Sequence, residues 1–164
     1  MLHGLIATAP AKIQQVEQTA AVADDSDEFD TLTEAVAAQD MPASPDAELN
    51  CLATGIYYEA KGEPLAGQLA VADVLINRAQ SGRFPRSICA VLTQPGQFSF
   101  VRGGQLPNAP ANRNWKQAMA VAQVAQKDLW DSPVPEALYF HARRVSPGWR
   151  MIKVGAVGNH VFYR

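Results

Sequence analysis

Residues 49–64, LNCLATGIYYEAKGEP, hold the pattern that decides the fold of this chain. Apolar residues recur there at the spacing of one helix face: Leu49, Leu52, Ala53, Ile56 and Ala60. Asp46 stands where an N-cap is expected, and Gly62 with Pro64 ends the pattern. The stretch therefore predicts an amphipathic helix that ends near Ala60.

Glu59 lies at the edge of that apolar face. On a helical wheel of about 100° per residue it falls within about 20° of Leu52. A carboxyl group there is partly desolvated, which disfavours its charged form and raises its pKa. A glutamate that stays protonated near neutral pH can act as a general acid. The alternative is a boundary glutamate that pairs with a lysine or arginine.

Glu63 follows four residues later, beyond the helix break. It could supply a second carboxylate to the same site or contact the substrate. It could also cap the next helix, because a carboxylate is stabilised at a helix N-terminus. We favour the cap over a second catalytic carboxylate.

The rest of the body alternates helical and loop-forming segments. A second helix is predicted from Pro64 to about Ala79 and a third over Asn114–Trp130. Residues 93–110 read as loop with a short hairpin, and Ala137–His141 and Asn159–Tyr163 read as short strands. The expected fold class is α+β and mainly helical, with a small antiparallel β element near the C-terminus.

Residues 1–47 have a different composition, with few large apolar side chains. Such a segment cannot bury enough surface to offset its ordering entropy. We therefore expect a disordered acidic arm or linker over 1–47, with a weak helix near 29–38, and a catalytic domain over 48–164. The first residues resemble the end of a signal peptide but lack a basic region.

Charge is divided between these two parts. The net charge is −2, yet residues 1–50 hold ten acids and one lysine, whereas residues 51–164 hold six acids and thirteen bases. A basic body suits a polyanionic partner such as nucleic acid, an anionic cell wall or a membrane surface, although ordinary solubility charge would look the same. No apolar run approaches the roughly 18–20 residues needed to span a bilayer.

Several polar and aromatic residues could line a binding groove. Gln97, Phe98 and Ser99 alternate in a loop-rich region, and Tyr139 and Trp149 add aromatic faces. Sugar rings pack on such faces, although Phe98 and Phe100 could equally belong to the core. His141 and His160 offer a weak metal-site signal, because no close H-x-x-x-H or C-x-x-C spacing accompanies them.

Taken together, these residues resemble the SleB/CwlJ-type cell wall hydrolases. The resemblance rests on three blocks: residues 51–78 around Glu59, residues 97–100, and residues 158–164. It implies a lysozyme-like fold and cleavage of the β-1,4 bond between N-acetylmuramic acid and N-acetylglucosamine. The catalytic glutamate of the family maps to Glu59. The implied substrate-binding residues are Gln97, Phe98, Ser99, Tyr139 and Glu63.

The resemblance implies a lytic transglycosylase or a muramidase. Because the sequence places no second acid well, and one acid suffices when the substrate supplies the nucleophile, we favour a lytic transglycosylase that needs no metal or cofactor. A muramidase-type hydrolase with a second carboxylate stays open. So do a catalytically silent wall-binding module and a metal-dependent amidase or peptidase. Peptidoglycan glycan strands are the expected partner of a monomer, with no nucleic acid and no membrane span.

The same function places the protein outside the membrane, in the periplasm or the extracellular cell wall. The two cysteines, Cys51 and Cys89, read as free buried thiols in a cytosolic protein. In an oxidising compartment they would instead pair. The resemblance therefore implies a Cys51–Cys89 disulfide.

Overall fold

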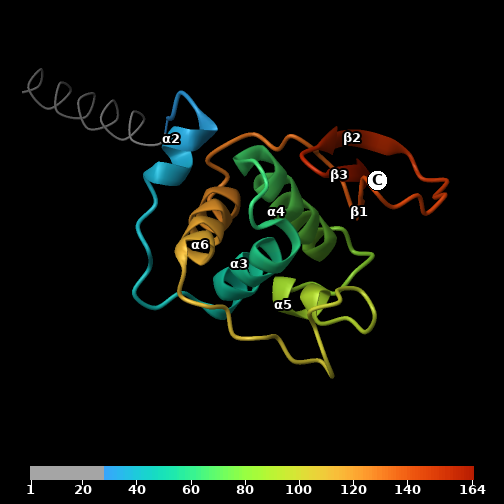
Figure 1. Cartoon of the computed structure of the whole chain (residues 1–164), viewed down its shortest axis with the longest axis horizontal. Helices are drawn as coiled ribbons and strands as arrows, with labels where there is room; N and C mark the ends of the chain where they lie inside the picture. Colours follow the sequence, from blue (N-terminus) through green and yellow to red (C-terminus); the bar gives the residue numbers. More distant parts are fainter. Residues whose placement is uncertain (1–27) are drawn as a thin grey trace, which may run out of the picture.

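The computed structural model describes residues 28–164, which form a helical body with a small β-sheet at one end (Figure 1). The helices of this part of the chain are α2 (Leu32–Ala37), α3 (Ala47–Ala60), α4 (Leu65–Gln80), α5 (Ile88–Leu92) and α6 (Arg113–Gln126). The strands are β1 (Tyr139–Ala142), β2 (Lys153–Val157) and β3 (His160–Tyr163). The predicted α+β class, mainly helical with a C-terminal antiparallel element, is confirmed.

Helix α3 lies at the centre of the body. It begins at the predicted N-cap, where the Asp46 carboxylate accepts a hydrogen bond from Leu49 N at 2.8 Å. Residues 51–57 are all buried, and the helix packs against α4, α5 and α6. At Gly55 a Cβ atom would lie only 2.6 Å from Leu75 Cδ1, so the glycine lets α4 approach α3 closely.

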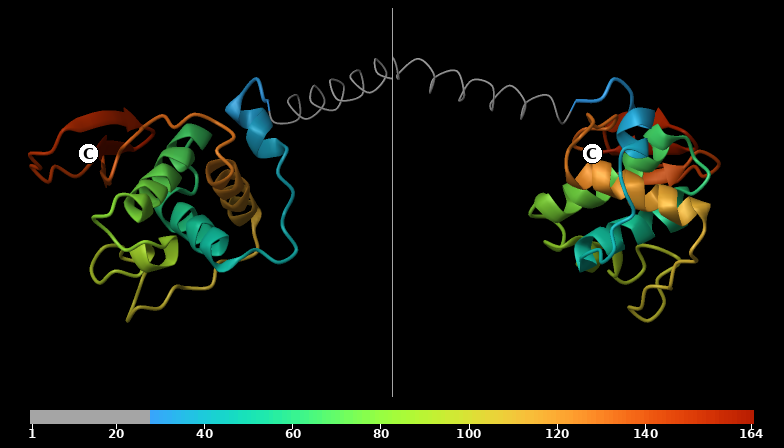
Figure 2. Two further views of the ribbon diagram at one scale, coloured as in Figure 1. Left: turned by 180° about the vertical axis from the view of Figure 1, so that it is seen from behind. Right: turned by 90° about the vertical axis from the view of Figure 1, so that its left-hand side faces the viewer.

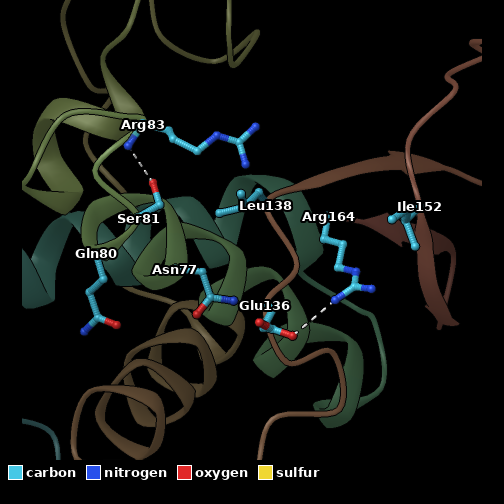
Figure 3. Close-up of a pocket in the computed structure, with 8 residues that line it drawn as sticks. All are labelled: Asn77, Gln80, Ser81, Arg83, Glu136, Leu138, Ile152 and Arg164. Carbon is cyan, nitrogen blue, oxygen red and sulfur yellow. Dashed lines mark hydrogen bonds and ion pairs between the residues drawn. The ribbon is translucent and has the colours of Figure 1, made fainter.

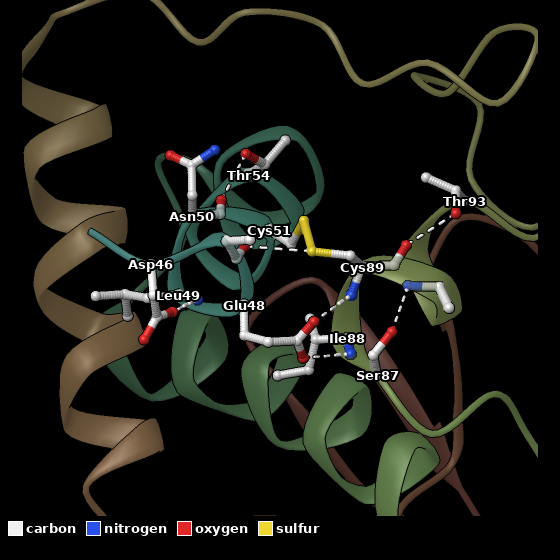
Figure 4. Close-up of a disulfide and its surroundings, with 12 residues drawn as sticks. Asp46, Glu48, Leu49, Asn50, Cys51, Thr54, Ser87, Ile88, Cys89 and Thr93 are labelled. Atoms are coloured by element: carbon white, nitrogen blue, oxygen red, sulfur yellow. Dashed lines mark hydrogen bonds between the residues drawn. A yellow bond between two sulfur atoms is a disulfide. The ribbon is translucent and has the colours of Figure 1, made fainter. Parts of the chain in front are cut away.

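A disulfide joins α3 to α5 (Figure 4). Cys51 and Cys89 lie 38 residues apart in sequence with a Cα–Cα distance of 5.3 Å, so the predicted pairing is confirmed. Beside it, the Glu48 carboxylate accepts hydrogen bonds from Ile88 N at 2.6 Å and Cys89 N at 3.3 Å. The start of α5 is thus tied to the start of α3 by a covalent bond and by a carboxylate.

The sheet has the strand order β1-β3-β2, with both pairings antiparallel. Two of its strands were predicted, and they begin one or two residues later than expected. The third, β2, was missed because its sequence KVGAV is short, contains Gly155 and has a bulge between Lys153 and Gly155. The sheet lies at the opposite end of the helical body from α2 (Figures 1 and 2).

The structure departs from the expected disordered arm within residues 28–47. Helix α2 packs against α6, and its Ala35 and Val36 are 0% and 8% exposed. Gln123 of α6 donates from Nε2 to the carbonyl oxygen of Asp40 at 3.0 Å. This segment therefore joins the core, because Ala35 and Val36 are buried in it and the partly buried Phe29 and Leu32 pack against it. Residues 1–27, with the signal-like start, lie outside the described residues.

Two further expectations are corrected. The third helix ends at Gln126 instead of Trp130, since Lys127 is its C-cap and Asp128 adopts a φ of 54°. Between residues 93 and 110 the expected hairpin is reduced to one isolated bridge between Arg102 and Gln105. Within residues 28–164 no helix is long and apolar enough to cross a membrane.

Candidate active site

A cavity of about 470 Å³ lies between the end of α3, the loop after α5 and the sheet. Its lining comes from segments far apart in sequence: Tyr58, Glu59, Arg78, Gln97, Phe98, Tyr139, Phe140, His141, Ala142, Arg144, Trp149 and His160. Five residues that the sequence analysis proposed for the site therefore meet here, namely Glu59, Gln97, Phe98, Tyr139 and Trp149.

Glu59 is the only carboxylate among the described residues that line this cavity. It stands in the last turn of α3, where the helix edge meets the open space. Burial raises the pKa of its carboxyl group above the ordinary value of 4.5. The wheel position of Glu59 predicted this desolvation, and the structure agrees with that prediction. The group is suited to donate a proton at a pH where an exposed glutamate is ionised.

Arg78 lines the cavity from helix α4. Its guanidinium is buried, with the residue 5% exposed, and Nε donates to the carbonyl oxygen of Leu138 at 2.7 Å. Nη1 donates to Gln97 Oε1 at 3.3 Å. The charge also lies over the Phe84 ring, 4.6 Å from its centroid. Because Oε1 of Gln97 is occupied, its amide nitrogen remains to donate to a ligand.

A cluster of aromatic rings also lines the cavity, and its Tyr139 ring lies 5.5 Å from the Arg78 guanidinium. Trp149, which is 40% exposed, packs edge-on against Tyr139 at 6.3 Å, His141 at 5.2 Å and Tyr163 at 5.4 Å between ring centroids. His141 Nε2 lies 2.8 Å from the Tyr163 hydroxyl and Nδ1 lies 2.7 Å from the Ala142 carbonyl oxygen. These contacts hold a solvent-accessible indole in one orientation beside the cavity.

Glu63 does not line the Glu59 cavity, and its carboxylate makes a contact that the sequence analysis did not predict. Helix α4 has Pro64 at its N-cap and no side-chain cap, so the predicted capping by Glu63 is wrong. Its carboxylate instead accepts hydrogen bonds from Asn159 N at 2.6 Å and Asn159 Nδ2 at 2.9 Å. At the break between α3 and α4, the Glu63 side chain points away from the start of α4 and toward the β2–β3 turn.

His160 adjoins this contact and also lines the Glu59 cavity. Its Nδ1 lies 3.6 Å from Glu63 Oε1, which is too long for a hydrogen bond. Burial lowers the pKa of His160, and the charge of Glu63 only partly opposes that effect. The imidazole is therefore neutral at neutral pH and adds no positive charge to the cavity.

The remaining expected residues are divided between the cavity lining, the core and the surface. Ser99 is exposed and does not line the cavity, and Phe98 is both a core residue and part of the lining. Phe100 is half-buried and stacks on Tyr58 at 5.0 Å between centroids. Sequence reasoning missed Arg78 and Arg144 as lining residues. The first block of the family resemblance, residues 51–78, ends at Arg78 and carried the only signal for that residue. No sequence feature pointed to Arg144.

A second cavity, of about 530 Å³, lies next to the first (Figure 3). Leu138 lines it, whereas the following residue, Tyr139, lines the Glu59 cavity. Arg83 links the two by donating from Nη2 to the Tyr139 hydroxyl at 3.3 Å. Its one carboxylate, Glu136, is exposed and lies 3.4 Å from Arg164, so this cavity offers no desolvated acid. Within residues 28–164 no cluster of three His, Cys, Asp or Glu residues is placed to hold a metal ion.

Residues 62–163 match the family described as cell wall hydrolase. The spore cortex-lytic enzyme of Bacillus subtilis (strain 168) is 35% identical over 132 residues, which cover 79% of this chain and 41% of that protein. That of Oceanobacillus iheyensis is 32% identical over 120 residues, 70% of this chain and 41% of the relative. The chain thus matches less than half the length of these curated relatives.

Solved structures extend the likeness to the fold. The catalytic domain of the germination-specific lytic transglycosylase SleB from Bacillus anthracis is 30% identical, with a TM-score of 0.60, covering 76% of this chain and all of that one. The Bacillus cereus SleB catalytic domain gives 30% identity and a TM-score of 0.56, over 76% of this chain and 95% of the other. With most of its described residues matched in both sequence and fold, the chain belongs to the cell wall hydrolase family.

Proposed function

We propose that this chain cleaves the β-1,4 bond between N-acetylmuramic acid and N-acetylglucosamine in peptidoglycan, as a lytic transglycosylase. The observation that carries the proposal is the single desolvated carboxyl group, Glu59, in the cavity that gathers Gln97, Phe98 and Tyr139. The likeness to proteins named spore cortex-lytic enzyme and lytic transglycosylase supports it. A peptidoglycan substrate places the site of action outside the cell membrane.

Glu59 would act twice. First it protonates the glycosidic oxygen as the bond to C1 of the muramic acid breaks, which leaves an oxocarbenium-like centre. The resulting carboxylate then takes the proton of the C6 hydroxyl of the same sugar, and O6 attacks C1. The ring closes as a 1,6-anhydro sugar and Glu59 regains its proton, so no water is consumed.

The rest of the cavity would hold the sugar and limit the access of water. The free amide of Gln97 can donate to a sugar hydroxyl or acetamido carbonyl, and the exposed face of Trp149 offers a stacking surface. Tyr139 and Phe98 close the cavity beside them. Exclusion of water matters because water competes with the C6 hydroxyl for the cationic centre.

A retaining hydrolase would need a second carboxyl about 5 Å from the first, and an inverting one a carboxyl at about 6.5–9.5 Å. Glu63 is the nearest in sequence, but both of its oxygens are engaged by Asn159. Asp73 and Asp128 line a different cavity. This arrangement favours the transglycosylase over the muramidase and over a silent wall-binding module, since a binding module has no use for a protonated acid.

Digestion of purified sacculi, followed by mass spectrometry of the released fragments, tests the proposal. The wild type should release fragments with 1,6-anhydro ends. Glu59→Gln should lower the rate by about 10²–10⁴-fold, because the amide keeps the shape but donates no acidic proton. Glu136→Gln, the same change at an exposed carboxylate, is the matched control and should cleave normally. Fragments one water heavier would show a muramidase, and retained activity in Glu59→Gln would remove the assigned acid.

A further inference from the structure

The rim of the Glu59 cavity carries an arginine to which the proposed mechanism gives no role. Arg144 lines the cavity together with Trp149, from the loop that connects β1 and β2. This loop extends away from the helical body beside the sheet (Figure 1). If the chain cleaves glycan strands as proposed, Arg144 is positioned at the cavity rim to distinguish between substrates.

The backbone on both sides of Arg144 is held in place. Arg143 N donates to the Asn159 carbonyl oxygen at 2.8 Å, and Val145 N donates to the Ala142 carbonyl oxygen at 3.0 Å. The Arg143 side chain is also engaged, with Nε donating to the Gly158 carbonyl oxygen at 2.7 Å. Arg144 therefore projects from an anchored turn, which lowers the entropy that its guanidinium loses on meeting a ligand.

The two arginines of the cavity differ in what they contact. Arg78 is buried and bonded to Leu138 and Gln97. Arg144 is exposed, and in the part of the chain that the structure describes its guanidinium makes no hydrogen bond or ion pair. Arg144 also does not pair with Glu59. A nearby cation would lower the pKa of Glu59, whereas burial raises it and no cation opposes that effect. One guanidinium of the cavity thus remains available to a substrate.

The surrounding charge is one-sided. Glu136 is the last acidic residue, so residues 137–164 hold five bases, Arg143, Arg144, Arg150, Lys153 and Arg164, and no acid. No acidic side chain in this segment competes for Arg144, and the neighbouring bases strengthen the attraction for an anion. A guanidinium presents parallel N–H donors that match the two oxygens of a carboxylate.

We infer that Arg144 is a specificity-determining residue that binds a carboxylate on the muramic acid side of the glycan strand. Two carboxylates have this chemistry. One belongs to the lactyl ether of a muramic acid without a peptide, and the other belongs to an acidic residue of an attached stem peptide. Trp149 would hold the sugar, and Arg144 would hold the charged substituent that distinguishes muramic acid from N-acetylglucosamine.

The test measures binding in the full chain carrying Glu59→Gln, so that the strands are not cut. Three ligands are compared: strands with stem peptides, strands with the peptides removed, and peptide-free strands whose carboxyl groups are converted to neutral methylamides. Arg144→Gln should weaken binding about tenfold on a carboxylate-bearing strand and leave binding to the neutral strand unchanged. A loss on peptide-free strands identifies the lactyl carboxylate, and a loss only on peptide-bearing strands identifies the stem.

Arg150→Gln is the matched control, because it removes the same charge from the same loop at a residue outside the cavity lining. Arg144→Lys should recover part of the affinity, since it keeps the charge but not the paired donors. An equal loss on the neutral strand, or an equal loss in Arg150→Gln, would overturn the inference. A wild-type chain that binds with this pattern but releases no fragments would overturn the proposed cleavage and leave the role of Arg144 standing.

Discussion

Two carboxyl groups of the body are desolvated, and their surroundings give them different chemistry. Glu59 opens into the cavity that gathers the sugar-binding candidates. Asp73, on α4, lines a separate cavity of about 410 Å³ with Asp128 and Ser132. Its Oδ2 is buried and has no hydrogen-bond partner among residues 28–164. Burial alone therefore does not identify a candidate catalytic acid. The other residues that line the same cavity distinguish Glu59 from Asp73.

Asp73 should make the stability of the fold depend on pH. Burial raises its pKa from 3.8 to about 6, against the opposing Ser132 hydroxyl and with a smaller rise from Asp128. Between about pH 4 and 6 the folded state holds a proton that the unfolded state has lost, so stability falls as pH rises through this window. Asp73→Asn should remove this loss and stabilise the fold at pH 7 by roughly 1–3 kcal/mol.

Urea unfolding of both proteins from pH 4 to 8 measures this effect. The difference in unfolding free energy between the wild type and Asp73→Asn reports on Asp73 alone, because Glu59 and His160 titrate in both proteins. Asp131→Asn makes the same change at an exposed position and serves as the matched control. A constant difference between Asp73→Asn and the wild type over the whole range would contradict the assignment.

At the scale of elements, one contact links the α3–α4 junction to the sheet. The Glu63 carboxylate holds the backbone of the β2–β3 turn through Asn159. Gly158 permits this contact in two ways: its φ is +57°, and a Cβ atom there would lie 2.5 Å from Glu63 Oε1. The next residue but one, His160, lines the Glu59 cavity, so the turn also positions part of the site.

Gly158→Ala should destabilise the protein by about 2–4 kcal/mol, because it adds left-handed backbone strain and displaces the Glu63 carboxylate. Gly148→Ala separates these causes, since Gly148 has a φ of +69° but no atom within 4 Å of an added Cβ. It should cost only about 1–2 kcal/mol, measured as urea midpoints at constant m-value. Equal losses in the two variants would mean that the Glu63 contact contributes nothing.

At the scale of the whole molecule, the core continues into residues that composition assigned to the arm. Helix α2 covers α6 at the end of the body opposite the sheet (Figure 2). The Cys51–Cys89 bridge constrains the centre and, for a loop of this length, stabilises the fold by about 4 kcal/mol in the chain-entropy model. The site lies at the sheet end, so the α2 end supports it only through the packing of the helices.

Removal of residues 1–45 should therefore lower stability without changing the chemistry. It exposes the α6 face under Ala35 and Val36 and leaves Gln123 without the Asp40 carbonyl, a loss of about 2–4 kcal/mol. A chain without residues 1–27 gives the baseline, because it keeps α2. Urea unfolding measures the loss, and the cleavage rate of the folded shortened protein should match the baseline. Equal stability of the two shortened chains would contradict the role of α2.

Local patterns predicted much of this protein. The apolar spacing of residues 49–60 predicted α3 and the desolvated edge position of Glu59, because both follow from helix periodicity over one or two turns. The N-cap at Asp46 and two of the three strands were read in the same way. The cysteine pairing followed from the implied compartment, since spacing alone left it open.

Tertiary structure decided the rest. The meeting of Glu59 with Arg144, Trp149 and His160 in one cavity depends on how the sheet packs against α4 beside the end of α3. No spacing along the chain encodes this arrangement. Glu63 turns to Asn159, 96 residues away, instead of to its own helix. Ala35 and Val36 are buried because α6 presents a matching face, although their own segment is acidic. In each case the partner is distant in sequence, so the free energy of the contact exists only once the chain has folded.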